Sequence, residues 1–228
     1  IVREKSALRR LIAKAGEITQ RCFGDGGDFD QVLDFAERAI FEISENKHRA
    51  AFHPLSKIID INIDALEKRQ ENRALVTGIP TGYTRLDNMT SGLQGSDLII
   101  LAARPAMGKT ALALNIARNA ALGGNVPVAV FSLEMSNEQL VQRLIAQETG
   151  IDTQRLRTGK LNPDEWPLFT HAIEVLSDTT IFLDDTPAIT PIQLRTKCRR
   201  LSMEFNLDLV IVDYLQLMAS DSRNENRV

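Results

Sequence analysis

The residues with the clearest chemistry form the stretch Ala103-Arg104-Pro105-Ala106-Met107-Gly108-Lys109-Thr110. A loop of this kind before a helix suits a nucleoside triphosphate, because backbone N–H groups and the helix N-terminus face an anion. Lys109 adds a positive charge, and the Thr110 hydroxyl can ligate Mg²⁺. The stretch departs once from the pattern G-x-x-x-x-G-K-[ST], since Ala103 replaces the first glycine. The alternative is a chance Gly-Lys-Thr at a helix start.

The sequence on either side predicts the elements that position this loop. Residues 98–102 are Leu-Ile-Ile-Leu-Ala, an apolar run that is typical of a strand. A helix is expected from Thr110 to about Leu122, where Gly123-Gly124 ends it. Strand, loop and helix in this order are the context that makes the motif specific.

Asp213 and Glu134 are the candidate acids. Asp213 follows four apolar residues, where a carboxylate can hold the water shell of Mg²⁺ during phosphoryl transfer. The alternative is an aspartate that caps a turn. Glu134 ends the apolar run 127–133 and can accept a proton from the attacking water if that strand neighbours residues 98–102. The alternative for Glu134 is a surface charge.

Gln216 lies three residues after Asp213. An amide both donates and accepts hydrogen bonds, which suits a residue that senses the γ-phosphate or orients water. An ordinary loop amide is an equally good interpretation from its chemistry alone.

Apolar strands alternate with helices through the larger part of the chain. The expected strands are 98–102, 127–133, 180–183 and 209–213. Helices are expected after Ser136, from Asn162 with Trp166, Phe169, Ile173 and Leu176 inward, and after Thr190. This alternation predicts an α/β fold with a parallel sheet covered on both faces and a ligand at the carboxyl ends of the strands.

The N-terminal part is expected to be helical. Apolar spacing predicts one helix over residues 1–22 and a second over 29–43, joined by a Gly-rich turn as an antiparallel hairpin. This hairpin is either an oligomerisation or docking module or the remains of a larger domain. A short helix with an apolar stripe follows in 54–76 and either folds back or docks on a neighbouring chain. The expected domains are therefore 1–53, 54–76 and 77–228.

Composition excludes several classes of protein. The 228 residues are 43% hydrophobic and 25% charged, and their longest apolar runs are strand-sized, so no membrane span is expected and a cytoplasmic location is the default. Cys22 and Cys198 suggest neither a disulfide framework nor a zinc site. The net charge of −3 gives no sign of a basic face that coats nucleic acid, so any nucleic-acid contact is expected to be local, and composition alone neither suggests nor excludes one. The chain lacks an initial Met and ends in a polar stretch after a strand, so a piece of a longer protein is expected.

Three blocks of sequence closely resemble the bacterial replicative DNA helicase family of the DnaB type. They are Ala-Ala-Arg-Pro-Ala-Met-Gly-Lys-Thr at 102–110, Phe-Ser-Leu-Glu-Met at 131–135 and Ile-Val-Asp-Tyr-Leu-Gln-Leu-Met at 211–218. The entry stretches 78–83 and 92–94 are also similar. The resemblance covers about residues 58–218, and the alanine in place of the first glycine is usual in this family.

The resemblance implies a RecA-like P-loop NTPase core in a homo-hexameric ring, which hydrolyses ATP between subunits, moves along single-stranded DNA and unwinds the replication fork. Lys109 and Thr110 would bind phosphates and Mg²⁺, Glu134 would be the catalytic carboxylate and Asp213 the Walker-B acid. Gln216 would relay the nucleotide state to the DNA loops. The linker helix would dock on the adjacent subunit, and the hairpin would join a collar that meets primase and a helicase loader.

The chain also departs from a full family member. It ends before most of the DNA-contacting loops and before the arginine finger that the family supplies in trans, and the first half of the N-terminal domain is absent. Arg223 and Arg227 can begin a DNA-facing loop, or they can be ordinary solvated arginines. The other candidates are a RecA-like recombinase or KaiC-type ATPase, and an assembly module that uses the nucleotide only as a switch.

Overall fold

A computed structural model describes residues 2–24, single helical residues at 32, 33, 35, 36, 39, 40, 55, 59 and 63, and residues 76–219. The chain divides into two units, Ile1–Lys68 and Arg69–Val228, and each is described by itself. Among the described residues, no helix combines the length and the apolar character that crossing a membrane requires.

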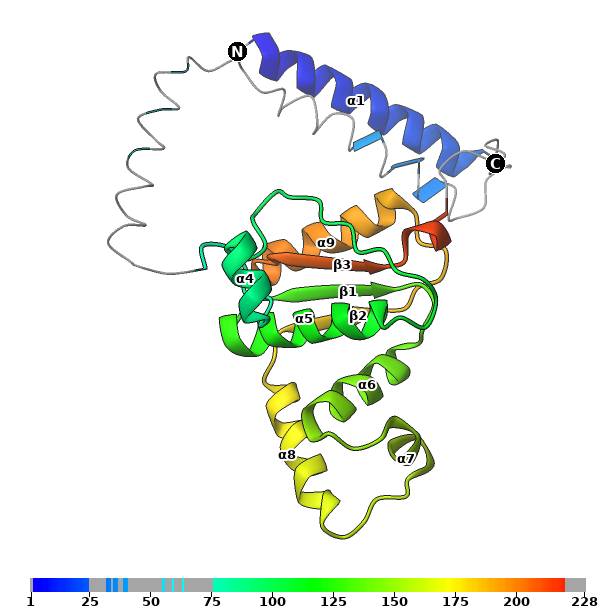
Figure 1. The fold of residues 1–228 in the computed structure, drawn as a ribbon. Coiled ribbons are helices and arrows are strands. Elements are labelled where there is room, and N and C mark those ends of the chain that lie inside the picture. Colours follow the sequence, from blue (N-terminus) through cyan, green and yellow to red (C-terminus); the bar gives the residue numbers. More distant parts are fainter. Residues whose placement is uncertain are drawn as a thin grey trace. The chain divides into compact units, whose positions relative to one another are not determined.

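The first unit begins with the expected helix. Helix α1 spans Val2–Phe23 (Figure 1). Every described residue within 29–43 is also helical. The Arg21 guanidinium carbon lies 3.7 Å from the centre of the Phe35 ring, a cation–π contact between the two segments. The contact brings the two segments together, and their antiparallel arrangement stays a prediction. Residues 55, 59 and 63 of the expected linker helix are helical, and the rest of that prediction lies outside the described residues.

The second unit is built on a parallel sheet. Strands β1 (Val128–Ser132), β2 (Ile181–Asp184) and β3 (Leu209–Asp213) lie in the order β2-β1-β3, and both pairs are parallel (Figure 1). Val128 pairs with Ile181 on one side and Leu209 on the other. The expected parallel sheet and three of its four strands are therefore confirmed.

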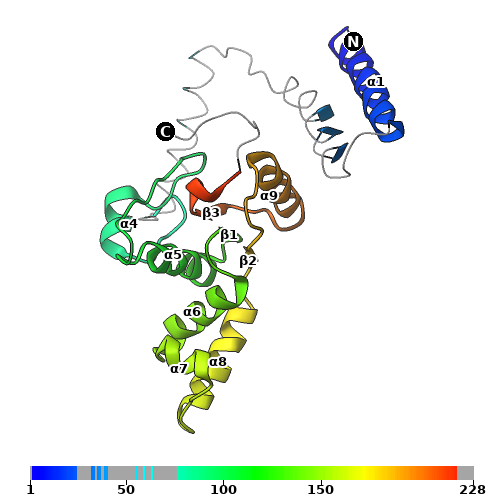
Figure 2. The same cartoon turned by 90° about the vertical axis from the view of Figure 1, so that its right-hand side faces the viewer.

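Alternate residues of β1 enter two different cores. Val128 and Val130 pack against helices α5 (Lys109–Gly124) and α6 (Asn137–Thr149). Ala129 and Phe131 point to the other face, where Ile189 and helix α9 (Pro191–Phe205) cover them. Figure 2 shows α5 and α9 on opposite sides of the sheet. A strand buried on both faces needs the continuous apolar sequence that β1 has.

The strand expected at residues 98–102 is not formed. These residues belong to no strand, and Leu98 and Ile100 are 85% and 73% exposed. A strand needs a neighbour to accept and donate its backbone hydrogen bonds. Within residues 76–219, β3 pairs only with β1, and residues 98–102 pair with no described strand. The prediction of a strand at residues 98–102 is therefore wrong for this structure.

The helices that follow β1 differ from expectation in three ways. A short helix, α7 (Thr153–Thr158), was not expected. Helix α8 spans Glu165–Ser177 and so begins after Asn162. Trp166 and Ile173, which were expected to point inward, are 53% and 42% exposed, whereas Ala172 is the buried residue of this helix.

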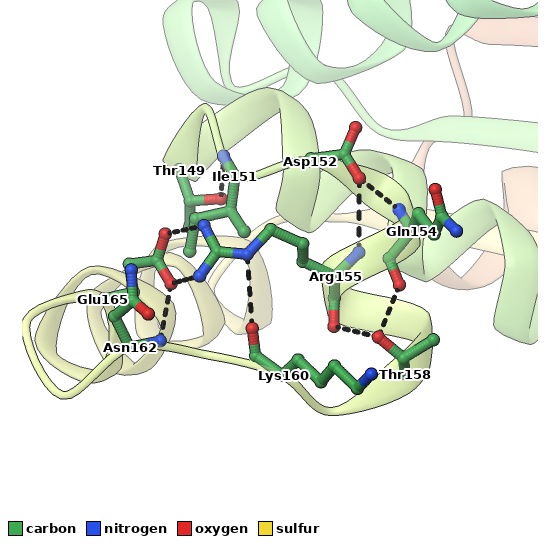
Figure 3. A network of polar contacts seen from close by, with 9 residues as sticks. All are labelled: Thr149, Ile151, Asp152, Gln154, Arg155, Thr158, Lys160, Asn162 and Glu165. Carbon is green, nitrogen blue, oxygen red and sulfur yellow. Dashed lines mark hydrogen bonds and ion pairs between the residues drawn. The ribbon is translucent and has the colours of Figure 1, made fainter.

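A polar network explains where α8 begins (Figure 3). The two terminal nitrogens of Arg155, on α7, donate to the two carboxylate oxygens of Glu165 at 2.6 Å each. Glu165 also accepts the Asn162 N–H at 2.7 Å, and this bond is the main reason why the pKa of Glu165 lies below its ordinary value, with Arg155 adding to it against the opposing effect of burial. A bidentate fork of this kind fixes orientation as well as distance.

Asp87 is a buried charge that ties the entry segment to the sheet unit. It lies on helix α4 (Thr84–Thr90), is 6% exposed, and accepts the Thr81 N–H, the Thr81 hydroxyl and the Gly82 N–H at 2.9, 2.7 and 3.1 Å. The Thr81 carbonyl in turn accepts from the Asn119 amide on α5 at 3.0 Å. Gly82 has a φ of +79°, and a Cβ there would lie 2.3 Å from that amide nitrogen, so only glycine fits.

Replacing Asp87 with alanine should lower the free energy of unfolding by about 2 kcal/mol, because the buried N–H and hydroxyl of Thr81 and the partly buried N–H of Gly82 lose their acceptor. For a domain of this size the melting temperature should fall by about 4–8 °C at pH 7. Thermal melts of the intact protein check this, and Asp97→Ala, which removes an exposed carboxylate, is the matched control. An unchanged melting temperature would contradict the structural role given to Asp87.

The contribution of the Asp87 carboxylate to the free energy of unfolding should depend on pH. Burial raises the pKa of Asp87, but the hydrogen bonds from Thr81 and Gly82 outweigh it and leave the pKa below the ordinary value. A depressed pKa means that the stabilisation is present above about pH 4 and is lost as the pH falls through the folded-state pKa. The difference between wild type and Asp87→Ala should therefore shrink below that pH.

Candidate functional site

The loop 103–108 leads into an uncapped helix N-terminus. Helix α5 starts at Lys109, and its N-cap residue Gly108 has a φ of +87° in the left-handed region. Ala106 also has a positive φ, +64°, and residues 103–108 are exposed. No side chain caps the first turn of α5. Its first N–H groups are thus available to an anion, as a phosphate site requires.

Lys109, Thr110 and Asp213 meet at the carboxyl edge of the sheet. Asp213 ends β3 and is 6% exposed. The Lys109 ammonium lies 2.8 Å from one Asp213 carboxylate oxygen, and the Thr110 hydroxyl donates to the other at 2.5 Å. Residues about a hundred positions apart in sequence are thereby brought together. This is the arrangement that the two motifs predicted, and the roles of the three residues remain predictions.

The donor set fits a magnesium-bound triphosphate. A hydroxyl and a carboxylate are hard oxygen ligands of the type that Mg²⁺ prefers, and the ion usually takes only one or two ligands from the protein beside phosphate and water oxygens. Thr110 and Asp213 supply that number. Residues 76–219 contain no group of three or more His, Cys, Asp or Glu side chains placed to hold a metal.

Glu134 lies near the same edge of the sheet because the end of β1 is hydrogen-bonded to the end of β3. It lies two residues beyond β1 and is exposed. Ser132 pairs with Asp213 across the β1–β3 ladder, and the N–H of Leu133 donates to the Asp213 carbonyl at 2.8 Å. The condition stated for Glu134, that its strand neighbours residues 98–102, is not met, since β1 lies between β2 and β3. Its proximity to the candidate site rests on β3 instead.

The remaining predicted site residues are less well connected. Gln216 lies in a 3₁₀ turn (Leu215–Leu217), is exposed, and its side chain makes no hydrogen bond to another residue of the described segment 76–219. Arg223 and Arg227 lie outside the described residues.

Tyr214 is a contact that the sequence reasoning missed. The Lys109 ammonium lies 4.3 Å from the centre of the Tyr214 ring, a cation–π distance. The residue stands next to Asp213 in the third motif, but nothing in a one-dimensional pattern shows that its ring meets the lysine.

A parallel sheet whose carboxyl edge joins a Gly-Lys-Thr loop, a threonine hydroxyl and a buried aspartate is typical of the class of P-loop nucleotide-binding domains. Within that class, the chain belongs to the DnaB-like helicase C-terminal domain family, whose model matches residues 78–228.

The relatives extend over the whole chain. It is 50% identical over 228 residues to the replicative DNA helicase DnaB of Geobacillus stearothermophilus, covering 100% of this chain and 50% of that protein. It is 44% identical over 226 residues to the replicative DNA helicase DnaC of Bacillus subtilis (strain 168), covering 99% and 50%. The chain thus spans about half the length of the curated relatives it matches.

Two solved structures are similar in fold. One is an ATPase domain, which gives a TM-score of 0.69 at 29% identity, over 74% of this chain and 61% of that one. The other is a DnaB-like replicative helicase, described together with its interactions with primase, which gives a TM-score of 0.67 at 25% identity, over 99% and 52%.

Proposed function

We propose that this chain is the ATP-hydrolysing core of a ring-forming replicative DNA helicase, which moves along single-stranded DNA and unwinds the duplex at the replication fork. The observation that carries the proposal is the meeting of Lys109, Thr110 and Asp213 at the sheet edge. The names of the relatives, which are replicative DNA helicases, support it.

In this proposal each residue of the site has one task. The backbone of residues 103–110 surrounds the phosphates, and Lys109 balances their negative charge. Thr110 and Asp213 would hold Mg²⁺, partly through water, and the bound ion would supply positive charge that offsets the charge of the phosphates. Glu134 accepts the proton of the attacking water. Gln216 relays the state of the nucleotide toward the DNA-binding loops.

The proposed assembly is a homo-hexamer in the cytoplasm, associated with the nucleoid. Its partners are single-stranded and fork DNA, a primase and a helicase loader. The primase is supported by the solved relative that is described with it. Arg223 and Arg227 are proposed to contact DNA phosphates. Arginines that neutralise phosphates release the counterions condensed on DNA, and this release favours binding.

A fork assay tests the proposal. The intact protein is mixed with a labelled forked duplex that carries single-stranded tails, with ATP and Mg²⁺, and its mass in solution is measured under the same conditions. The expected result is a hexamer that separates the strands, with no separation in EDTA or with a non-hydrolysable ATP analogue.

Two other outcomes would overturn it. An open filament that coats DNA and promotes pairing without unwinding would indicate a recombinase. Partner binding that depends on nucleotide but not on its hydrolysis, with no strand separation, would indicate a switched assembly module.

A further inference from the structure

The turn that carries Glu134 is closed by a buried serine. Ser132, the last residue of β1, is 2% exposed. Its hydroxyl donates to the Met135 carbonyl at 2.7 Å and accepts the Met135 N–H at 3.1 Å. Between these two residues, the Leu133 N–H is bound to the carbonyl of Asp213. The backbone is therefore fixed immediately before and immediately after Glu134.

A second attachment follows at the start of α6. The backbone N–H of Asn137 donates to one carboxylate oxygen of Asp185 and its side-chain amide donates to the other, at 3.0 Å each. Asp185 directly follows β2, so this pair joins the turn after β1 to the end of the neighbouring strand.

The loop that carries Asp185 is itself held in place. Lys197 of α9 donates to the Asp184 carboxylate at 2.5 Å and to the Thr186 hydroxyl at 2.7 Å. The Thr186 N–H donates to Asp184 at 3.0 Å. Asp184 and Thr186, the two neighbours of Asp185 in sequence, are thus hydrogen-bonded. These bonds hold the backbone that positions the Asp185 carboxylate as the acceptor for Asn137.

Glu134 contrasts with its surroundings. Its side chain is exposed and makes no hydrogen bond or ion pair within residues 76–219, although the backbone around it is bound to β1, β2 and β3. We propose that Ser132 and Asp185 are positioning residues, which fix the turn 132–137 so that the Glu134 carboxylate is oriented along the carboxyl edge of the sheet. This inference rests on the proposed function in taking Glu134 as the proton acceptor.

The physical reason is geometric. A general base works only within hydrogen-bond reach of the proton it removes, and a displacement of about 1 Å can cost about 100-fold in rate. Neither Ser132 nor Asp185 has a hydrogen bond or ion pair to Lys109 or Thr110 in the described residues. Loss of either should therefore slow hydrolysis without weakening nucleotide binding.

Asp185→Ala in the intact protein is the main test, with DNA-stimulated ATP hydrolysis as the readout. We expect kcat to fall about tenfold or more, while KM and the Kd for a non-hydrolysable ATP analogue stay within about twofold. Asp185→Asn keeps one acceptor and should lose less. Ser132→Ala should show the same selective loss of kcat.

Asp152→Ala is the matched control. Asp152 also accepts two N–H groups at a helix start, those of Gln154 and Arg155, but it lies at α7 (Figure 3). Both alanine variants should lower the melting temperature by a few degrees, since each removes a carboxylate that accepts two N–H groups at the start of a helix. Only Asp185→Ala should lower kcat. Equal kcat for the two variants would overturn the proposal.

A double-mutant cycle separates this inference from the proposed function. If Glu134 is the base, Glu134→Gln lowers kcat, and adding Asp185→Ala to it should lower the residual rate by less than about twofold. A full additional tenfold loss would show that Asp185 acts independently of Glu134. If Glu134→Gln alone leaves kcat unchanged, the assigned base is wrong, which is a failure of the proposed function.

Discussion

Lys109→Ala should abolish ATP-driven strand separation by the intact protein. The ammonium is the fixed positive charge at the phosphate-binding loop, beside Asp213 and the Tyr214 ring. Without it, negative charge that develops on the phosphates in the transition state has no counterpart at that point. We expect the rates of ATP hydrolysis and fork unwinding to fall at least about 100-fold.

Lys160→Ala is the control for this variant. Lys160 is exposed and lies between α7 and α8, so the same change of residue removes a charge far from the loop in sequence. Its hydrolysis and unwinding rates should match those of the wild type. Unwinding by Lys109→Ala at a rate near that of the wild type would contradict the whole assignment of the nucleotide site.

Glu134→Gln should separate nucleotide binding from hydrolysis. The amide keeps the size of the side chain but cannot accept the proton of the attacking water, so the hydrolysis rate should fall by about 100- to 10,000-fold. Binding of ATP should persist, because the loop and Lys109 are intact. Single-turnover hydrolysis and equilibrium binding of a fluorescent ATP analogue measure the two quantities separately.

The same variant decides between a motor and a switch. A motor stops unwinding when hydrolysis stops, whereas a switched assembly module keeps its function with ATP bound. Glu174→Gln, an equal change at an exposed residue of α8, should leave all rates unaltered. Wild-type hydrolysis by Glu134→Gln would exclude this residue as the base.

The sequence predicted the elements whose signals are local. Strand β3 was placed at its observed bounds, because an apolar run ends there at a charged residue. The start of α9 was predicted because Thr190 and Gln193 form a capping box next to a proline. Residues 98–102 have the same kind of apolar run, but a strand exists only beside another strand, and that condition cannot be read from the run itself.

The residues of the candidate site also divide into those with a local sequence signal and those that depend on neighbours in space. Lys109, Thr110 and Asp213 belong to motifs that carry their own context, and the structure brings them together. The contact of the Tyr214 ring with Lys109 and the bonds of Asp185 to Asn137 depend on which loops lie next to each other in the folded sheet. The spacing of residues along the sequence does not show which loops these are. The inward side of α8 was misjudged because an apolar stripe shows which face avoids water but not whether a neighbour covers it.

The bonds of Asp87 with Thr81 and of Thr81 with Asn119 join the entry segment to helix α5. Asn119 lies ten residues along the helix from Lys109, which is about 15 Å at 1.5 Å per residue. The entry segment is therefore attached to the same helix whose first residue, Lys109, contacts Asp213 at the sheet edge.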